Sequence, residues 1–193
     1  MQHAQSDIDP FVTRHDGWAQ AIPAVLLLAV LNRIRGRYPT MARQPEPLIL
    51  TASLTTGVAR VAHGMSASVR LIDEVLELDH VAWETTLFVG DTEFFRTKEG
   101  PFPNHQLRLS VRPTTGLAAL NYMDHDDPQM PIANSYNPNR PLPDVDLIFN
   151  GAMGAVFPRA AAIPISNARS ALNQWLETRK RPTCIEWHPY DSF

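Results

Sequence analysis

The stretch from Ile163 to Trp187 constrains the fold most, because it encodes a helix, a stop and a strand in one short window. Ser166 is a residue type that caps helix N-termini. The basic run 179–181 suits the negative end of a helix dipole, and Pro182 prevents the helix from continuing. Between them, apolar residues recur at the spacing of a helix with one buried face: Ala168, Ala171, Leu172, Trp175 and Leu176.

A short strand is expected directly after this helix. Thr183, Ile185 and Trp187 alternate with Cys184 and Glu186, which is the period of two that strands show. We therefore predict a strand over these five residues, with Cys184 as a packed or semi-buried thiol. A helix joined to a strand in this way forms half of a small α+β core.

The remainder of the chain from residue 46 predicts one more helix and several strands. Ser66 is placed to cap a helix from Ala67 to about Leu78, and the turn residues Thr56-Gly57 and Thr115-Gly116 each predict a hairpin. We expect a single α+β domain over residues 46–193, in which two helices pack on an antiparallel-rich, mixed sheet and Trp83, Trp175 and Trp187 lie in the core. The predicted strands are Leu48–Thr55, Val58–His63, Val81–Gly90, Gln106–Arg112, Leu117–Met123, Ile132–Tyr136 and Val145–Asn150.

Residues 1–45 are interpreted as an N-terminal helical extension. Pro23 fits the first turn of a helix that runs from about Ala24 to Arg35. This extra helix is apolar nearly all round from Ala24 to Leu31, so it must be buried against the domain or against another chain. The second option allows a homo-oligomer, even a homo-oligomeric scaffold, held together through this helix. We also expect residues 1–40 to be dispensable for folding.

The composition is that of an ordinary soluble globular protein rather than a binder of nucleic acid or membrane. The net charge of −3 argues against a general nucleic-acid binder, which would carry a basic face. The most apolar run, residues 21–31, is too short to span a bilayer, and its basic residues follow it, unlike those of a signal peptide. With a single cysteine the chain cannot form an internal disulfide. We therefore predict a cytoplasmic protein.

The sequence contains no motif of a known catalytic site. It lacks a nucleophile elbow, a phosphate-binding loop, a dinucleotide fingerprint and the zinc-deaminase pattern. Its seven histidines show no ligand spacing. We predict a protein that is not an enzyme and that binds neither a cofactor nor a metal ion. One alternative stays open, a small metal-dependent hydrolase that uses His105, His125, Asp127 and Glu186.

Several segments, in their order and spacing, resemble the first numbered family of immunity proteins. The segments are FPNHQLRLSVRPTTGLAALNYMD, VDLIFNGAMGAVFP and the closing RPTCIEW, and the resemblance covers roughly residues 47–188. Members of that family neutralise toxins of the nucleic-acid deaminase class in bacterial polymorphic toxin systems. The resemblance implies a protein whose partner is a cognate deaminase toxin domain, bound so that the active site or the nucleic-acid groove of the toxin is occluded.

Acidic and aromatic residues are the natural candidates for contacts with such a toxin. From Asp79 to Met130 acids outnumber bases by eight to four, and the acids of residues 124–127 lie close to tyrosines. Acidic groups complement a groove that binds phosphates, and aromatic anchors are frequent at interface hot spots. The residues that we predict to contact the partner are Tyr122, Asp124, His125, Asp126, Asp127, Tyr136, Glu186, His188 and Tyr190.

Overall fold

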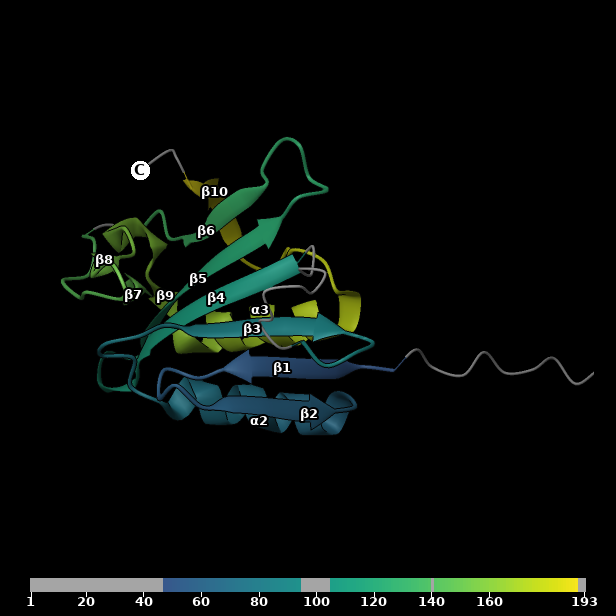
Figure 1. Cartoon of the computed structure of the whole chain (residues 1–193). Helices are drawn as coiled ribbons and strands as arrows, with labels where there is room; N and C mark the ends of the chain where they lie inside the picture. The colour runs from purple at the N-terminus through teal and green to yellow at the C-terminus, as the bar shows by residue number, and fades with distance from the viewer. Residues whose placement is uncertain (1–46, 95–104, 140, 191–193) are drawn as a thin grey trace, which may run out of the picture. The chain divides into compact units, whose positions relative to one another are not determined.

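The computed structural model describes residues 47–94, 105–139 and 141–190, with the side chains of residues 105 and 106 left out (Figure 1). The N-terminal helix expected over residues 24–35 therefore lies outside the described residues. Within them, the fold is α+β, as the sequence predicts: one large sheet carries two α-helices. Among the described residues every strand pairing is antiparallel, so the sheet is less mixed than expected.

Seven strands follow one another across the large sheet in the order β10-β6-β5-β4-β3-β1-β2, and a short β9 pairs with β5 beside this path. The two predicted hairpins, β1–β2 and β4–β5, are confirmed, and β6 has the predicted bounds. The strands are β1 (Ile49–Ser53), β2 (Ala59–His63), β3 (Thr85–Gly90), β4 (His105–Arg112), β5 (Leu117–Asp124), β6 (Ile132–Tyr136), β9 (Ile163–Pro164) and β10 (Glu186–Pro189).

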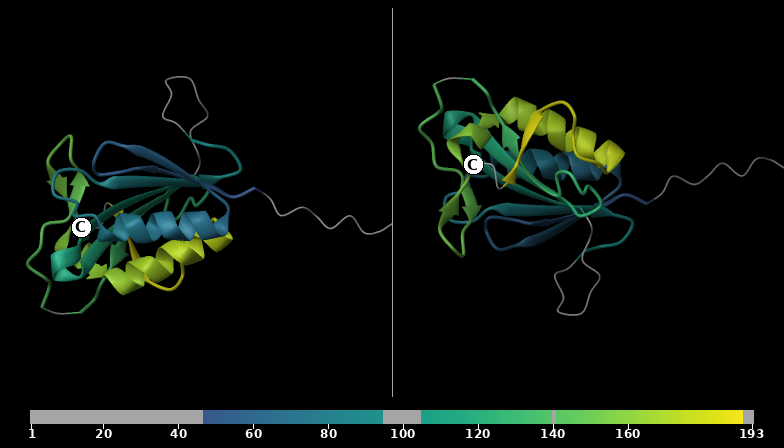
Figure 2. Two further views of the ribbon diagram at one scale, coloured as in Figure 1. Left: turned by 90° about the horizontal axis from the view of Figure 1, so that it is seen from below. Right: turned by 90° about the horizontal axis from the view of Figure 1, so that it is seen from above.

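Both helices cover the same face of the sheet, as the two views in Figure 2 show. They are α2 (Met65–Glu77) and α3 (Ile165–Thr178). The alternation of β4 explains this arrangement, because Leu107, Leu109 and Val111 point into the core between sheet and helices. Trp175 is fully buried in the same core, as predicted. We call the opposite side the helix-free face.

The helices begin earlier than the serine caps predict. α2 starts at Met65 after Gly64, which has φ 80°, and α3 starts at Ile165 directly after Pro164 of β9. Neither helix has a side-chain cap, so the prediction of Ser66 and Ser166 as caps is wrong. In both cases the chain enters the helix straight from a strand or a tight turn, which places each serine inside the first turn.

The closing strand begins three residues later than predicted. The backbone N–H groups of Thr183 and Cys184 donate to Oε1 of Gln174 on α3, at 2.9 and 3.1 Å. These two N–H groups are therefore bonded to a helix side chain and not to a neighbouring strand, and β10 pairs with β6 only from Glu186. Cys184 is exposed, which corrects the prediction of a packed or semi-buried thiol.

Residues 145–162 form an arm that lies on part of the helix-free face. The arm contains a small two-stranded sheet, β7 (Ile148–Asn150) and β8 (Ala155–Val156), so the predicted strand over 145–150 does not join the main sheet. Its apolar residues bury Ala119 of β5 in a second, smaller core. The members of that core are Ala119, Leu147, Phe157, Ala161 and Ala162. The arm leaves the helix-free face open on both sides of itself.

Candidate partner-binding surface

A row of polar residues crosses the helix-free face from one strand to the next. In the order in which the strands lie in the sheet, β1, β3, β4, β5, β6 and β10 each contribute one residue to this row. Only one member, Arg108, carries a fixed charge. An amide pair within the row is buried and internally bonded, because Asn121 Nδ2 donates to Asn134 Oδ1 at 2.9 Å. The row consists of Ser53, Thr86, Arg108, Asn121, Asn134 and His188.

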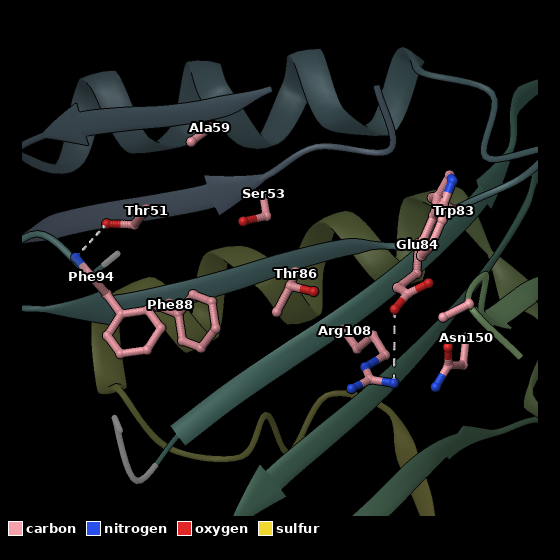
Figure 3. A pocket seen from close by; sticks show the side chains of 11 residues that line it. Thr51, Ser53, Ala59, Trp83, Glu84, Thr86, Phe88, Phe94, Arg108 and Asn150 are labelled. Carbon is pink, nitrogen blue, oxygen red and sulfur yellow. Dashed lines mark hydrogen bonds and ion pairs between the residues drawn. The ribbon is translucent and has the colours of Figure 1, made fainter. Parts of the chain in front are cut away.

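A hollow of about 510 Å³ opens on the helix-free face over β1, β3 and β4 (Figure 3). Its volume lies within the usual range of protein ligand pockets. Hydroxyl groups and aromatic rings share its wall, and Thr51 Oγ1 accepts a hydrogen bond from the Phe94 N–H at 3.0 Å. The residues that matter for its chemistry are Thr51, Ser53, Trp83, Glu84, Thr86, Phe88, Phe94, Arg108 and Asn150.

Arg108 lies at the side of this hollow and connects the sheet to the arm. Its Nη1 donates to the Phe149 carbonyl oxygen at 3.3 Å, and its guanidinium lies 5.0 Å from the centre of the Phe149 ring. The same Nη1 is 3.9 Å from Oε1 of Glu84, at the limit of an ion pair. We call Arg108, Glu84 and Phe149 the Arg108 cluster.

Glu84 holds the tip of the arm next to Trp83. Its carboxylate accepts the Gly151 N–H at 2.9 Å. The approach is so close that a Cβ on Gly151 would lie 2.3 Å from the Ala82 carbonyl oxygen and 2.7 Å from the Trp83 ring. Trp83 is 48% exposed, which corrects its assignment to the core: its ring forms a wall of the hollow instead.

Four of the nine predicted contact residues gather at the β6–β10 edge of the helix-free face. We call these four residues the edge cluster. The Tyr136 and His188 rings are 4.6 Å apart, and Glu186 lies opposite Tyr136 in the ladder and is exposed. Tyr190 stacks on Phe149 of the arm at 5.2 Å. Phe149 therefore links the edge cluster to the Arg108 cluster on the other side of the arm.

Four more predicted contact residues lie in the acid loop, residues 124–131, which joins β5 to β6. His125 and Asp126 are exposed, and Asp124 accepts the Asp126 N–H at 3.0 Å. Asp127 accepts the N–H groups of Gln129 and Met130, and these hydrogen bonds, helped by nearby Arg181, lower the pKa of its carboxyl. Its role in the structure is thus to shape the loop.

Arg181 gathers the remaining predicted residue, Tyr122, into the interior. Its Nη1 pairs with Asp127 at 2.9 Å, its Nη2 donates to the Met130 carbonyl oxygen, and its guanidinium lies 5.5 Å from the Tyr122 ring. Tyr122 is fully buried, and burial, followed by the charge of Asp124, raises the pKa of its hydroxyl. The side chain of Tyr122 points into the helix-covered core, so it has no direct access to a partner. We call Arg181, Asp127 and Tyr122 the Arg181 cluster.

Trp187 belongs to the interior only in part. It is half-buried, meets the Tyr122 ring edge-on at 6.0 Å and donates its Nε1–H to the Pro182 carbonyl oxygen at 2.7 Å. The indole therefore closes the β10 side of the core, close to the position that the sequence predicts.

The residues of the hydrolase alternative do not form a metal site in the described part of the chain. No group of three or more His, Cys, Asp or Glu side chains converges there. Asp127 is committed to Arg181, and the side chain of His105 lies outside the described residues. In that same part of the chain no helix has the length and apolarity needed to cross a membrane.

Sequence reasoning missed the hollow. Its residues come from strands that are far apart in the chain, and no motif joins them. The sequence feature that could have indicated it is the polar residues of β4 that alternate with its apolar ones: Arg108, Ser110 and Arg112. Of these, Ser110 is buried although it points away from the helices, and the two arginines contact the arm.

Comparison with protein families identifies a match to most of the described region. The model of the family described as Immunity protein Imm1 matches residues 57–189. No curated protein sequence matches the chain. The family match covers both helices, all strands of the main sheet except β1, the arm, and the edge cluster apart from Tyr190.

Proposed function

The chain belongs to the Imm1 family of immunity proteins, and on this premise we propose that it neutralises a cognate bacterial toxin of the deaminase class. Family membership itself implies an inhibitor that binds a toxin and performs no catalysis. The proposal adds the class of the toxin and the mode of inhibition: the bound protein occludes the active site or the nucleic-acid groove. It acts in the cytoplasm of the cell that encodes both proteins.

The observation that carries the mode of binding is the composition of the helix-free face. The edge cluster places three rings beside an exposed carboxylate, Glu186, and the arm extends this surface through Phe149. Aromatic residues that combine an apolar body with a polar atom are enriched at interface hot spots. The opposite face of the sheet is covered by α2 and α3.

The acid loop supports the same reading through charge. A deaminase that acts on nucleic acid has to hold phosphates with basic residues next to its pocket. The exposed acids of the loop complement such a track, which speeds the encounter and orients the two proteins. Asp126 and Glu186 are the exposed acids that we expect to lie nearest to the toxin.

The first experiment is co-purification of the full chain with the toxin domain that the neighbouring gene encodes, followed by a deaminase assay. We expect a stable complex and loss of deaminase activity at a stoichiometric ratio. Full deaminase activity in the presence of excess protein, with no complex formed, would refute the proposal.

A matched pair of charge reversals tests which face binds. Glu186 on β10 and Glu177 on α3 are both exposed, and they lie on opposite sides of the sheet. Glu186→Lys should weaken toxin binding about 10-fold or more, whereas Glu177→Lys should leave it unchanged. If Glu177→Lys is the damaging variant, the helices and not the helix-free face form the interface.

The N-terminal extension enters the proposal only as a possible oligomerisation element. Its apolar run, residues 24–31, can bury itself against a second copy of the chain. Sedimentation of the full chain and of a variant lacking residues 1–40 compares the two. We expect the truncated variant to be folded, monomeric and able to bind the toxin, and an insoluble product would contradict this.

A further inference from the structure

The hollow has more hydrogen-bond donors than its own residues can satisfy. Arg108 has five N–H groups, and within the described residues its hydrogen bond and its ion pair both use Nη1. Its Nε and Nη2 have no partner there. Figure 3 shows the guanidinium beside the hollow, with a dashed line from one nitrogen to Glu84 and its other nitrogens on the opposite side.

The neighbours of Arg108 add to this excess of donors. Asn150 uses its side-chain oxygen to accept the Met153 N–H at 3.3 Å, which leaves its amide N–H₂ to donate. The hydroxyls of Ser53 and Thr86 line the same space. The one carboxylate present, Glu84, already accepts the Gly151 N–H and lies beside Arg108. The hydroxyls can accept as well as donate, so the donors that need an acceptor are those of Arg108 and Asn150, and an occupant with acceptor atoms satisfies them.

The geometry of the pair between Arg108 and Glu84 leaves the guanidinium able to bind a second carboxylate. At 3.9 Å the contact exceeds hydrogen-bond length, so Glu84 offsets the charge of Arg108 without occupying its N–H groups. A carboxylate can accept two parallel N–H groups from one guanidinium, which is the strongest pairing that arginine makes. The rings of Phe88, Phe94 and Trp83 around the hollow would exclude water from that pair.

We propose that this hollow receives an aspartate or glutamate side chain of the toxin, with Arg108 as its anchor. The inference rests on the proposed function and adds to it a specific contact. The edge cluster brings the exposed acid Glu186 to the toxin, and Arg108 offers cationic donors on the same face. An interface that alternates in charge accepts one partner in one orientation and rejects partners with a different charge pattern.

Arg112 provides a matched control, because it lies on the same strand and the same face as Arg108. The side chains of Arg108 and Arg112 are 21% and 22% exposed, and each contacts a carboxylate and a carbonyl oxygen of the arm. Arg112 does not line the hollow. Its Nη1 is 3.2 Å from Asp79, a shorter contact than Arg108 makes with Glu84.

The experiment measures the dissociation constant of the full chain for the toxin domain that the neighbouring gene encodes. Arg108→Gln should weaken binding about 100-fold and Arg108→Lys about 10-fold, since lysine keeps the charge but loses the planar pair of donors. Arg112→Gln should change binding less than about 3-fold. Urea unfolding of each variant shows whether the arm remains in place.

A second variant keeps Arg108 and fills the space in front of it. Thr86→Phe places a ring in the hollow and should abolish binding, while the contact of Arg108 with Phe149 is retained. A charge reversal then identifies the occupant: Arg108→Glu should lose binding, and one Asp→Lys or Glu→Lys substitution in the toxin should restore it.

The outcomes separate this inference from the proposed function. If the wild-type chain does not bind the toxin, the proposed function fails first. If it binds, and Arg108→Gln and Thr86→Phe bind within about 3-fold of it, the inference is overturned and the proposed function stands. Two other results would also overturn it: a dimer of the chain that Arg108→Gln dissociates, or single-stranded DNA bound by the chain alone through Arg108.

Discussion

The two arginine clusters use the same chemistry for different purposes. Arg108 and Arg181 each place a guanidinium near an aromatic ring, a carboxylate and a carbonyl oxygen. Arg181 lies 2.9 Å from its carboxylate and reaches a carbonyl oxygen with a second nitrogen, whereas Arg108 stands 3.9 Å from its carboxylate and keeps two nitrogens uncommitted within the described residues.

The difference between them is a difference in accessible space. In the Arg181 cluster the guanidinium lies near the buried ring of Tyr122, and its pair with Asp127 connects the acid loop to the segment after α3. The Arg108 cluster borders a hollow of about 510 Å³. An arginine with a buried ring and a carboxylate nearby is therefore not by itself a sign of a binding site. The sign is a set of donors that remain unsatisfied next to a space that a partner can enter.

The largest expected effect is a loss of stability at the Arg181 cluster. Tyr122→Ala should lower the free energy of unfolding by about 3–5 kcal/mol, because it removes a fully buried ring from the core. The matched variant Phe149→Ala, at the half-buried ring below Arg108, should cost less than half as much. Urea denaturation followed by circular dichroism measures both. Equal losses would mean that the two clusters do not differ in structural role.

The pH dependence of stability should come from His80, which hydrogen-bonds Thr85 at the start of β3. His80 is fully buried, its Nδ1–H donates to the Leu78 carbonyl oxygen, and its Nε2 accepts from the Thr85 hydroxyl at 2.7 Å. Burial lowers its pKa from 6.5 to about 4, so the unfolded chain takes up a proton before the folded one does. Stability should therefore fall as the pH drops from about 6.5 to about 4, by up to about 3 kcal/mol.

Two comparisons test this assignment. His80→Gln should remove the loss between pH 6.5 and pH 4 from the urea-unfolding profile. The lowered pKa of Asp127 predicts a separate loss in the Arg181 cluster, which begins as the pH falls into the usual titration range of an aspartate and continues below it. Asp127→Asn should change the profile only in that more acidic range. A profile of His80→Gln that still falls between pH 6.5 and 4 would assign the effect to another group.

The next prediction concerns the close contact that holds the arm against Trp83 and the Arg108 cluster. Gly151→Ala should destabilise the protein by about 1–3 kcal/mol, because the added Cβ would collide with the Ala82 carbonyl oxygen and the Trp83 ring. Toxin affinity should fall as well, since the hydrogen bond to Glu84 is lost. Gly90→Ala is the control: its Cβ would find its nearest neighbour at 3.7 Å, an ordinary contact. A tolerated Gly151→Ala would mean that the arm is not held by this approach.

The smallest effect is expected at the exposed acids of the loop. Asp126→Asn should weaken toxin binding by less than about 1 kcal/mol, mainly through slower association, and the difference should vanish at high salt. Stopped-flow measurements at two salt concentrations test this. A loss that persists at high salt would place Asp126 in a desolvated contact, comparable to the one proposed for Arg108.

The sequence determined the local structure of this protein because periodicity is a local property. The spacing of Ala168, Leu172 and Trp175 predicts the buried side of α3, and the alternation of β4 predicts which of its residues enter the core. The bounds of β6 and both hairpin pairings followed from the same kind of pattern. The family resemblance rested on the order of such segments and agrees with the family match.

Tertiary structure decided where these segments begin and what their outward residues do. Gln174 captures the backbone of Thr183 and Cys184 and delays β10, a contact that no periodicity contains. Tyr122 and Tyr136 are both tyrosines close to the acid loop, yet only the second lies on the helix-free face. The Arg108 cluster exists because β4 pairs with β3 and because the arm places Phe149 against Arg108. Such contacts join residues far apart in the chain, so their geometry arises only when the sheet is assembled.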